Sequence, residues 1–129
     1  MDRWQKLDTA AVATLATLNP NGSPHLVPVV FARIGERIVT AIDGKAKSGS
    51  PLRRLSNIRA NPTVCLLAHR YDEDWSKLWW VRVDGRATIV EADPHALTAL
   101  RDRYPQYQSV EIPGPIISIE ALGIRSWSA

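Results

Sequence analysis

Apolar positions along the chain fall into short runs separated by turn residues, a pattern typical of an antiparallel β protein. A strong turn signal, Asn19-Pro20-Asn21-Gly22, joins the first two runs and leaves Gly22 free to take a positive φ. The second run is apolar on both faces, so both faces need cover, and Pro28 within it indicates a sheet edge or a bulge. The expected strands are Val12–Leu18, His25–Ala32, Ile38–Ile42, Thr63–Ala68, Leu78–Val90 and Ile116–Glu120.

Two further segments have helical spacing. Ser50-Pro51 is suited to begin a helix that runs to about Ala60, with Leu52, Leu55 and Ile58 on one side. Asp93-Pro94 caps a second helix, whose buried side carries Leu97, Leu100 and Tyr104. The long fifth strand is expected to bend at Asp84-Gly85. The pattern therefore predicts a mainly β fold, a small antiparallel barrel of about six strands with two short helices.

Length and composition narrow the class of protein. The 129 residues suit one domain, and 45% hydrophobic with 22% charged residues describe a globular chain. Cys65 is the one cysteine, which excludes a disulfide within the chain. We find neither an apolar stretch of about 18 residues, as a membrane span needs, nor the apolar core of a signal peptide. We expect one cytoplasmic domain, residues 1–129, without a membrane partner.

The net charge of +3 is concentrated in one segment of the chain. Residues 44–59 hold five basic side chains and no carboxylate, whereas the remaining residues hold eleven basic and thirteen acidic side chains. A local excess of this kind indicates a site for a small anion. A nucleic-acid binder would instead need a basic stripe with interleaved aromatic residues, which the chain lacks.

The basic segment has the features of a phosphate or carboxylate site. A helix that begins near Pro51 directs unpaired backbone N–H groups and the positive end of its dipole toward the preceding loop. Arg53 and Asn57 lie four residues apart and share a helix face. The alternative is a solvated basic helix face. The candidate anion-binding residues are Lys45, Lys47, Ser48, Arg53, Arg54 and Asn57.

Three of the five tryptophans cluster at Trp75, Trp79 and Trp80. On a strand, Trp79 and Trp80 point to opposite faces, so one can fill a core while the other needs a partner subunit or a flat ligand. Arg82 lies on the same face as Trp80 and is placed to meet an anion. A dimer interface filled by indole rings is as good an interpretation as a ligand contact.

Side chains suited to chemistry of their own are scarce. His25, His69 and His95 are scattered without metal-ligand spacing, so no metal site is expected. Cys65 is most simply a buried small hydrophobe, and the run Asp72–Asp74 a solvated hairpin tip. If the protein is an enzyme, a bound cofactor supplies the reactivity.

The chain resembles the pyridoxamine 5′-phosphate oxidase-like split barrels. The segment Val12–Thr17, followed by Asn21–Phe31, is similar to the opening hairpin of that family. Lys45-Ala46-Lys47, Leu52-Arg53-Arg54-Leu55 and Asp74-Trp75-Ser76-Lys77-Leu78-Trp79-Trp80 are similar to its branch of probable F420-dependent oxidoreductases from actinobacteria. The resemblance covers nearly the whole chain.

This resemblance implies a homodimer of Greek-key split β-barrels with two cofactor sites at the subunit interface. The basic residues named above would hold the cofactor phosphate, and Trp75, Trp79 and Trp80 would border the ring or the substrate, from either subunit. His25 is a candidate proton donor. The deazaflavin ring would rest along the second strand, at His25, Leu26, Val27, Pro28 and Val29.

Two functions remain open. The first is hydride transfer between reduced F420 and a small conjugated or heterocyclic substrate, with FMN as the alternative cofactor. Residue chemistry does not separate the two cofactors, so the choice of F420 depends on the resemblance. The second is a non-enzymatic carrier of a flavin-type cofactor or haem.

Overall fold

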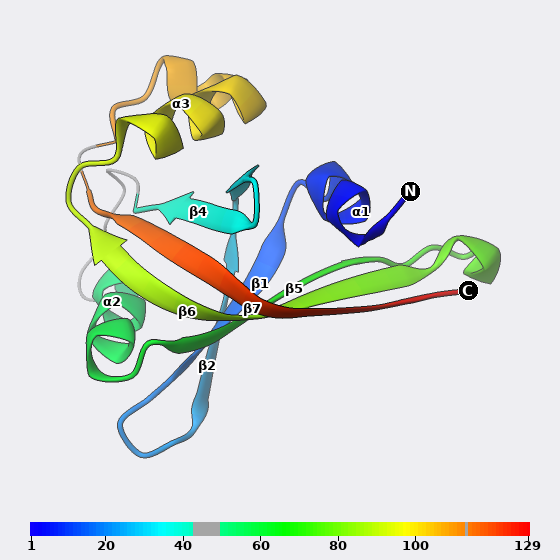
Figure 1. Cartoon of the computed structure of the whole chain (residues 1–129), viewed down its shortest axis with the longest axis horizontal. Coiled ribbons are helices and arrows are strands. Elements are labelled where there is room, and N and C mark those ends of the chain that lie inside the picture. Colours follow the sequence, from blue (N-terminus) through cyan, green and yellow to red (C-terminus); the bar gives the residue numbers. More distant parts are fainter. Residues whose placement is uncertain (43–49, 113) are drawn as a thin grey trace.

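The computed structural model describes residues 1–42, 50–112 and 114–129. In this part of the chain, seven strands form one antiparallel sheet in the order β2-β1-β5-β6-β7-β4-β3, accompanied by three α-helices (Figure 1). The fold is mainly β, as the sequence predicts. The strands are β1 (Ala13–Leu18), β2 (Pro24–Val29), β3 (Ala32–Ile34), β4 (Arg37–Ala41), β5 (Thr63–Arg70), β6 (Trp79–Val90) and β7 (Ile116–Ser128). The helices are α1 (Arg3–Thr9), α2 (Ser50–Ala60) and α3 (Pro94–Arg103), with short 3-10 turns at Trp75–Lys77 and Pro105–Gln108.

Two groups of buried side chains hold the sheet together. The first fills its inner face with alternate residues of the long strands, such as Leu66 of β5 and Val83 of β6, around Phe31. The second lies between α3 and the opposite face of β3 and β4, where Leu100 packs over Val39 and Ala41. Strand β4 is therefore covered on both faces, which explains its continuous apolar sequence.

The second apolar run is broken into two strands at Val30 and Phe31, whereas the sequence predicts one strand over His25–Ala32. At the break, side chains form hydrogen bonds with the backbone groups. The Phe31 N–H donates to the Tyr104 hydroxyl (3.2 Å), the Phe31 carbonyl accepts from Arg103 (2.7 Å), and the Val30 carbonyl accepts from Thr40 (2.8 Å). Because these groups are satisfied by side chains, the chain can leave β1 here and pair with β4.

The last strand is longer than the predicted Ile116–Glu120. Beyond Glu120 its side chains are mostly exposed, so the apolar signal is lost, but pairing with β6 continues to Ser128. The predicted bend in β6 is confirmed by a register shift between Asp84 and Gly85. A Cβ at Gly85 would lie 2.6 Å from the Ile119 Cγ2 and 2.8 Å from the Glu120 carbonyl oxygen, so the two strands can approach here only with glycine.

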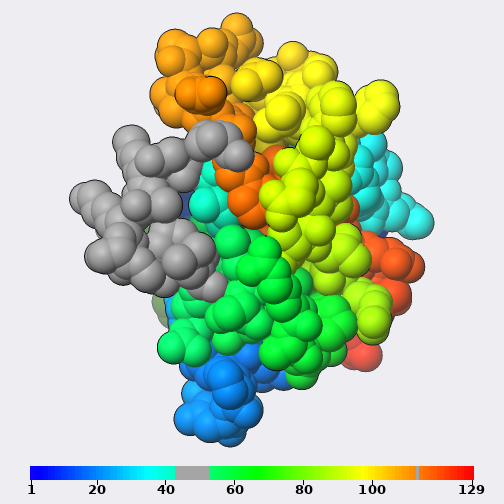
Figure 2. Space-filling view, turned by 90° about the vertical axis from the view of Figure 1, so that its left-hand side faces the viewer, coloured from blue at the N-terminus to red at the C-terminus, as the bar shows by residue number. Residues whose placement is uncertain are grey.

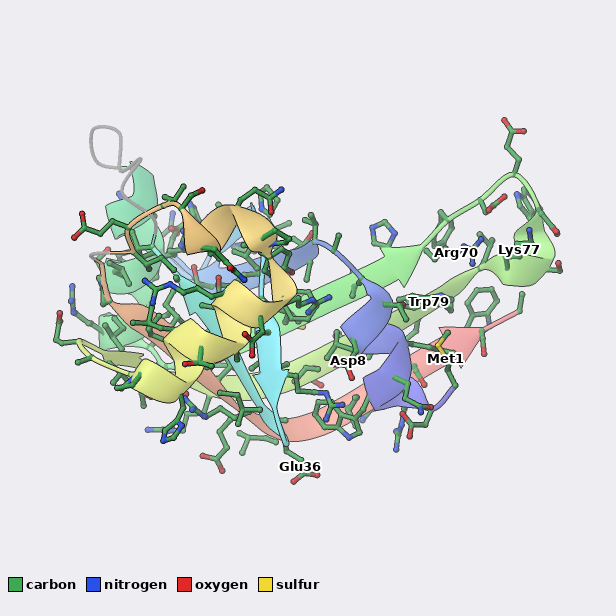
Figure 3. The ribbon with its side chains drawn as sticks, turned by 90° about the horizontal axis from the view of Figure 1, so that it is seen from above. Met1, Asp8, Glu36, Arg70, Lys77 and Trp79 are labelled. Atoms are coloured by element: carbon green, nitrogen blue, oxygen red, sulfur yellow. The ribbon has the colours of Figure 1, made fainter. Side chains whose placement is uncertain are left out.

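The far ends of β5, β6 and β7 project from the barrel as an arm, defined here as Ala68–Trp80 with Arg125–Ser128 (Figures 1 and 3). Helix α1 packs against it, with Lys6 donating to the Ser128 hydroxyl (3.1 Å). The predicted hairpin tip at Asp72–Asp74 lies at the end of the arm, between Arg70 and Lys77 (Figure 3).

Asp93 performs two tasks at the start of α3. Its carboxylate accepts from the Ala96 backbone N–H (3.1 Å) as the N-cap and pairs with Arg37 (2.7 Å). The Arg37 hydrogen bond, followed by the one from Ala96, holds the pKa of Asp93 below its ordinary value of 3.8.

We therefore predict that Asp93→Ala lowers the free energy of unfolding by about 1–2 kcal/mol at pH 7. The carboxylate stabilises the fold above its unfolded-state pKa, and that contribution is lost as pH falls through the lower folded-state value. The difference from the wild type should accordingly shrink below about pH 4 in urea titrations. Asp93→Asn retains a capping side chain and should lose less; equal losses for both variants would contradict the capping role.

Candidate functional site

Strand β2 is the end strand of the sheet and pairs only with β1 among the described strands. Its outward side chains, Pro24, Leu26 and Pro28, are exposed, and Leu26 retains 61% of its accessible surface. The prediction that Pro28 marks an edge is confirmed. The sequence predicts that both faces of this apolar strand are covered, but the described residues cover only its inner face.

The turn between β1 and β2 forms one wall of a polar cleft of about 560 Å³. His25 of β2 and Arg53 of α2 both line this cleft, so two residues singled out from the sequence meet across 28 positions of chain. The Nδ1 atom of His25 is buried and lacks a hydrogen-bond partner among the described residues. In Figure 2 the β1–β2 hairpin, in blue, projects below α2, in green. A buried unpaired nitrogen beside an exposed guanidinium suits an anionic or polar ligand.

Asn57 positions α2 rather than lining the cleft. Only 1% of its surface is exposed, and its Nδ2 donates to the Thr17 hydroxyl (3.0 Å) and to the Asn19 side-chain oxygen (3.1 Å). Leu55 and Ile58 are buried on the same helix. These contacts tie α2 to the end of β1 and to the turn, so Arg53 is held over the cleft. This structural role of Asn57 could be predicted only if it were known that the β1–β2 turn lies beside α2.

The remaining predicted anion-binding residues lie close by in the sequence. Arg54 follows Arg53 on α2 and is half-buried. Lys45, Lys47 and Ser48 lie outside the described residues.

The tryptophans lie on the arm, away from this cleft. Trp79 and Trp80 point to opposite faces of β6 as predicted: Trp79 is buried, and Trp80 is half-buried opposite Trp127. Trp75 is 77% exposed near the tip. Cys65 of β5 pairs with Ala16 of β1, next to the partner of His25, whereas Trp79 pairs with Arg70, about 17 Å farther along β5 at the rise of a strand. Within one chain the structure does not bring the tryptophans to His25.

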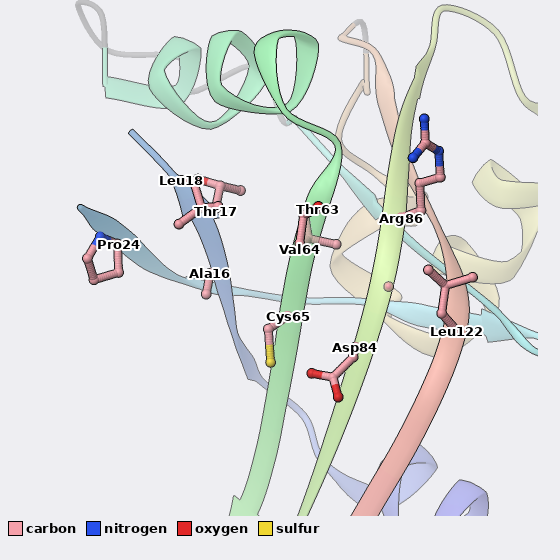
Figure 4. Close-up of a pocket in the computed structure, with 11 residues that line it drawn as sticks. Ala16, Thr17, Leu18, Pro24, Thr63, Val64, Cys65, Asp84, Arg86 and Leu122 are labelled. Atoms are coloured by element: carbon pink, nitrogen blue, oxygen red, sulfur yellow. The ribbon is translucent and has the colours of Figure 1, made fainter. Parts of the chain in front are cut away.

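Sequence reasoning missed a second hollow, a mostly apolar cavity of about 410 Å³ on the outer face of the sheet (Figure 4). Cys65 lies on its floor with Asp84 beside it, and Leu122 borders it. Cys65 is half-buried, so its description as a buried small hydrophobe needs correction. Burial, and then the hydrogen bond with Asp84, raise the pKa of the thiol to about 11. The thiol is therefore protonated at neutral pH and is no nucleophile.

In residues 1–42, 50–112 and 114–129, no three His, Cys, Asp or Glu side chains gather as metal ligands would. Over the same residues, no helix has the length and apolar character to cross a membrane.

The role assigned to Asn57 leads to a prediction. Asn57→Ala should lower the free energy of unfolding by about 1–3 kcal/mol, because the buried Thr17 of β1 and the half-buried Asn19 of the turn lose their donor. Hydrogen exchange should quicken at the amides of His25 and Val27. The neighbouring exposed Ser56→Ala serves as the control and should change neither quantity; equal stability of Asn57→Ala and wild type would contradict the role.

Comparisons with known proteins place this geometry in a family. Among curated proteins none matches, but structures do. A conserved hypothetical protein of Mycobacterium tuberculosis is 28% identical, with a TM-score of 0.75 over 96% of this chain and 81% of that one. A haem storage protein of Vibrio cholerae is 15% identical (TM-score 0.71, 97% and 90% covered). An FAD-binding protein of Mesorhizobium loti is 19% identical (TM-score 0.69, 95% and 87% covered).

These last two likenesses concern the fold alone. The family model described as pyridoxamine 5′-phosphate oxidase matches residues 4–128, nearly the whole chain, and agrees with the split-barrel sheet. The chain therefore belongs to the pyridoxamine 5′-phosphate oxidase family.

Proposed function

We propose that this protein is an oxidoreductase that binds coenzyme F420 and transfers a hydride between the deazaflavin and a small conjugated or heterocyclic substrate. The observation that carries the proposal is the meeting of His25 and Arg53 in one cleft beside the free edge of β2. An open strand edge can meet the polar edge of a flat ring, and a basic helix beside it can hold a phosphate. Membership of the family supports a flavin-type cofactor, while F420 in particular comes from the sequence resemblance.

The residues present fit such a cofactor. Arg53 lines the cleft, and the described lining holds no carboxylate, so a phosphate here can accept charge-assisted hydrogen bonds from the guanidinium. The buried Nδ1 of His25 needs a hydrogen-bond partner, which a ligand in the cleft can supply. When bound, F420 supplies a ring carbon that gives or accepts a hydride.

The protein's own residues would bind the cofactor and orient it. Arg53, Arg54, Lys45, Lys47 and Ser48 would hold the phosphate, and the backbone from His25 to Val29 would align the ring. The imidazole of His25 is the side chain best placed to hold or deliver a proton at this cleft. The protein would in this way position the reactants and exclude water, leaving the hydride chemistry to the cofactor.

We further propose that the protein works as a homodimer. On the outer face of the sheet, Leu26 of β2 and Leu122 of β7 are 61% and 66% exposed, so the described residues leave these apolar side chains uncovered. The arm and the β1–β2 turn, which forms one wall of the cleft, lie toward opposite ends of the sheet (Figure 1). A second copy packed antiparallel on it would bring the exposed Trp75 and the half-buried Trp80 of one subunit toward the cleft of the other.

The alternative functions are an FMN-dependent oxidoreductase and a non-enzymatic carrier of flavin or haem. The structure disfavours Cys65 as a haem ligand, because its raised pKa keeps the thiol protonated. Haem ligation would therefore depend on a histidine. A Soret band that appears on adding haem and is lost in His25→Ala would support the carrier function instead.

Titration with oxidised F420, followed by fluorescence, tests the proposed cofactor. We expect micromolar binding or tighter, and Arg53→Glu should weaken it at least tenfold because a charge-assisted contact becomes a repulsion. Arg59→Glu makes the same charge change at an exposed position of α2 that does not line the cleft, and should change affinity by less than about twofold. Equal effects of the two variants, or no binding by the wild type, would refute the proposal.

Sedimentation of the purified protein tests the dimer. The wild type should sediment as a dimer, and Leu122→Asp, which places a charge on the uncovered face, should shift it toward monomer. Val110→Asp alters another exposed apolar residue, in the connection after α3, and should leave the dimer intact. A wild type that is monomeric at micromolar concentration would refute the proposed dimer.

A further inference from the structure

The hydrogen-bonding phase of β2 is fixed by its turn. Asn19 and Ser23 close the hairpin, with the Asn19 N–H donating to the Ser23 carbonyl (2.9 Å). From this bonded pair, opposed residues alternate between pairs that exchange hydrogen bonds and pairs that do not. His25, Val27 and Val29 therefore bond to β1. The backbone groups of Pro24, Leu26 and Pro28 point the other way, toward the free edge of the sheet.

Two of those three outward positions are proline, which has no backbone N–H. The free edge of β2 from Pro24 to Pro28 consequently presents three carbonyl groups but a single N–H, that of Leu26. An edge strand of ordinary residues would present three N–H groups over the same length. A ligand lying along this edge meets abundant acceptors and one donor.

We infer that this donor-poor edge selects a deazaflavin ring over a flavin ring. The inference rests on the proposed function, in which the ring lies along β2. The two ring systems share the pyrimidine carbonyls and N3–H but differ at position 5. An oxidised flavin has a nitrogen there, which is a hydrogen-bond acceptor, whereas a deazaflavin has a carbon bearing a hydrogen.

The difference at position 5 has an energetic consequence. A buried acceptor left without a donor loses its hydrogen bonds to water and gains none in return, whereas a C–H group has no such requirement. A missing N–H opposite position 5 therefore counts against the flavin and is neutral for the deazaflavin, whereas one missing opposite the shared carbonyls counts equally against both rings. Discrimination arises from a polar group that the wrong ligand cannot satisfy.

Prolines on an end strand also have a purely protective role, because they prevent another strand from pairing with the free edge. The two roles predict different behaviour. If protection were the whole role, replacing a proline would leave the preference between two matched rings unchanged. If the prolines select the ring, a restored N–H should improve binding of the flavin and not of its deaza counterpart.

The test compares oxidised FMN with 5-deaza-FMN, which differ only at position 5, by fluorescence titration of the whole protein. We expect the wild type to bind 5-deaza-FMN about tenfold more tightly than FMN. Pro28→Ala restores an N–H at an exposed edge position and should narrow this ratio to about threefold or less. Pro24→Ala provides a second variant of the same kind. Leu26→Ala alters the strand's side chain without adding an N–H and should keep the wild-type ratio.

The ratio of the affinities for 5-deaza-FMN and FMN is measured within each variant. A loss of affinity caused by weakened folding affects both ligands and therefore cancels from this ratio. A wild type that binds FMN as tightly as 5-deaza-FMN overturns the inference but leaves the proposed cofactor site intact. If neither proline variant changes the ratio of the two affinities, the inference is likewise overturned and the proposed cofactor site stays intact. Binding of neither ring by the wild type refutes the proposed function and the inference together.

Discussion

Strand β2 is bonded to the sheet along one side only, so its position depends on side-chain hydrogen bonds at its two ends. At the turn, Asn57 of α2 bonds to Thr17 and Asn19. At the other end, the Tyr104 hydroxyl and Arg103 take the backbone groups of Phe31. Arg103 also donates to the carbonyls of Asp8 and Ala10 and stacks over the Phe31 ring, which joins α3 to the link between α1 and β1. These contacts hold an edge strand in place while its outer side stays open.

An open but fixed strand edge suits the cofactor site proposed above. A strand inside the sheet has its backbone groups satisfied by neighbours, whereas a loose edge would have to be ordered on binding at a cost in entropy. Fastening β2 at both ends avoids that cost. The same fastening explains why the helix that carries Arg53 and the strand that carries His25 share one cleft. The described residues that line this cleft include the cationic Arg53 and no carboxylate.

The sheet also separates two groups of candidate site residues. His25 and Arg53 lie at the turn end, whereas Trp75, Trp79 and Trp80 lie on the arm. Trp79 is buried in the core and pairs with Ser128. Trp75 and Trp80 are therefore the tryptophans of this group that can contact a ligand or a second subunit. The exposed Leu26 and Leu122 on the outer face, which the described residues leave uncovered, are the physical argument for a second copy, since exposed apolar surface can mark an interaction site.

Much of the fold could be predicted from local patterns. The turn at Asn19–Gly22, the edge position of Pro28, the bend at Asp84-Gly85 and the cap at Asp93 are all confirmed, because each depends on the conformational limits or side-chain chemistry of a few adjacent residues. The short initial helix α1 is capped in the same local way, by Asp2 and Gln5. Charge counting likewise isolated the basic segment, which includes Arg53.

What the sequence could not determine depends on partners far away in the chain. The break at Val30–Phe31 is set by Tyr104, Arg103 and Thr40, and the full length of β7 by its pairing with β6. Asn57 looked like a ligand from its helix face, but packing against β1 turned it inward. By itself the sequence determined which residues bear charge and where the backbone lacks an N–H. Only the tertiary structure decided which of those groups face one another, because hydrogen-bond phase and strand order are properties of the whole sheet.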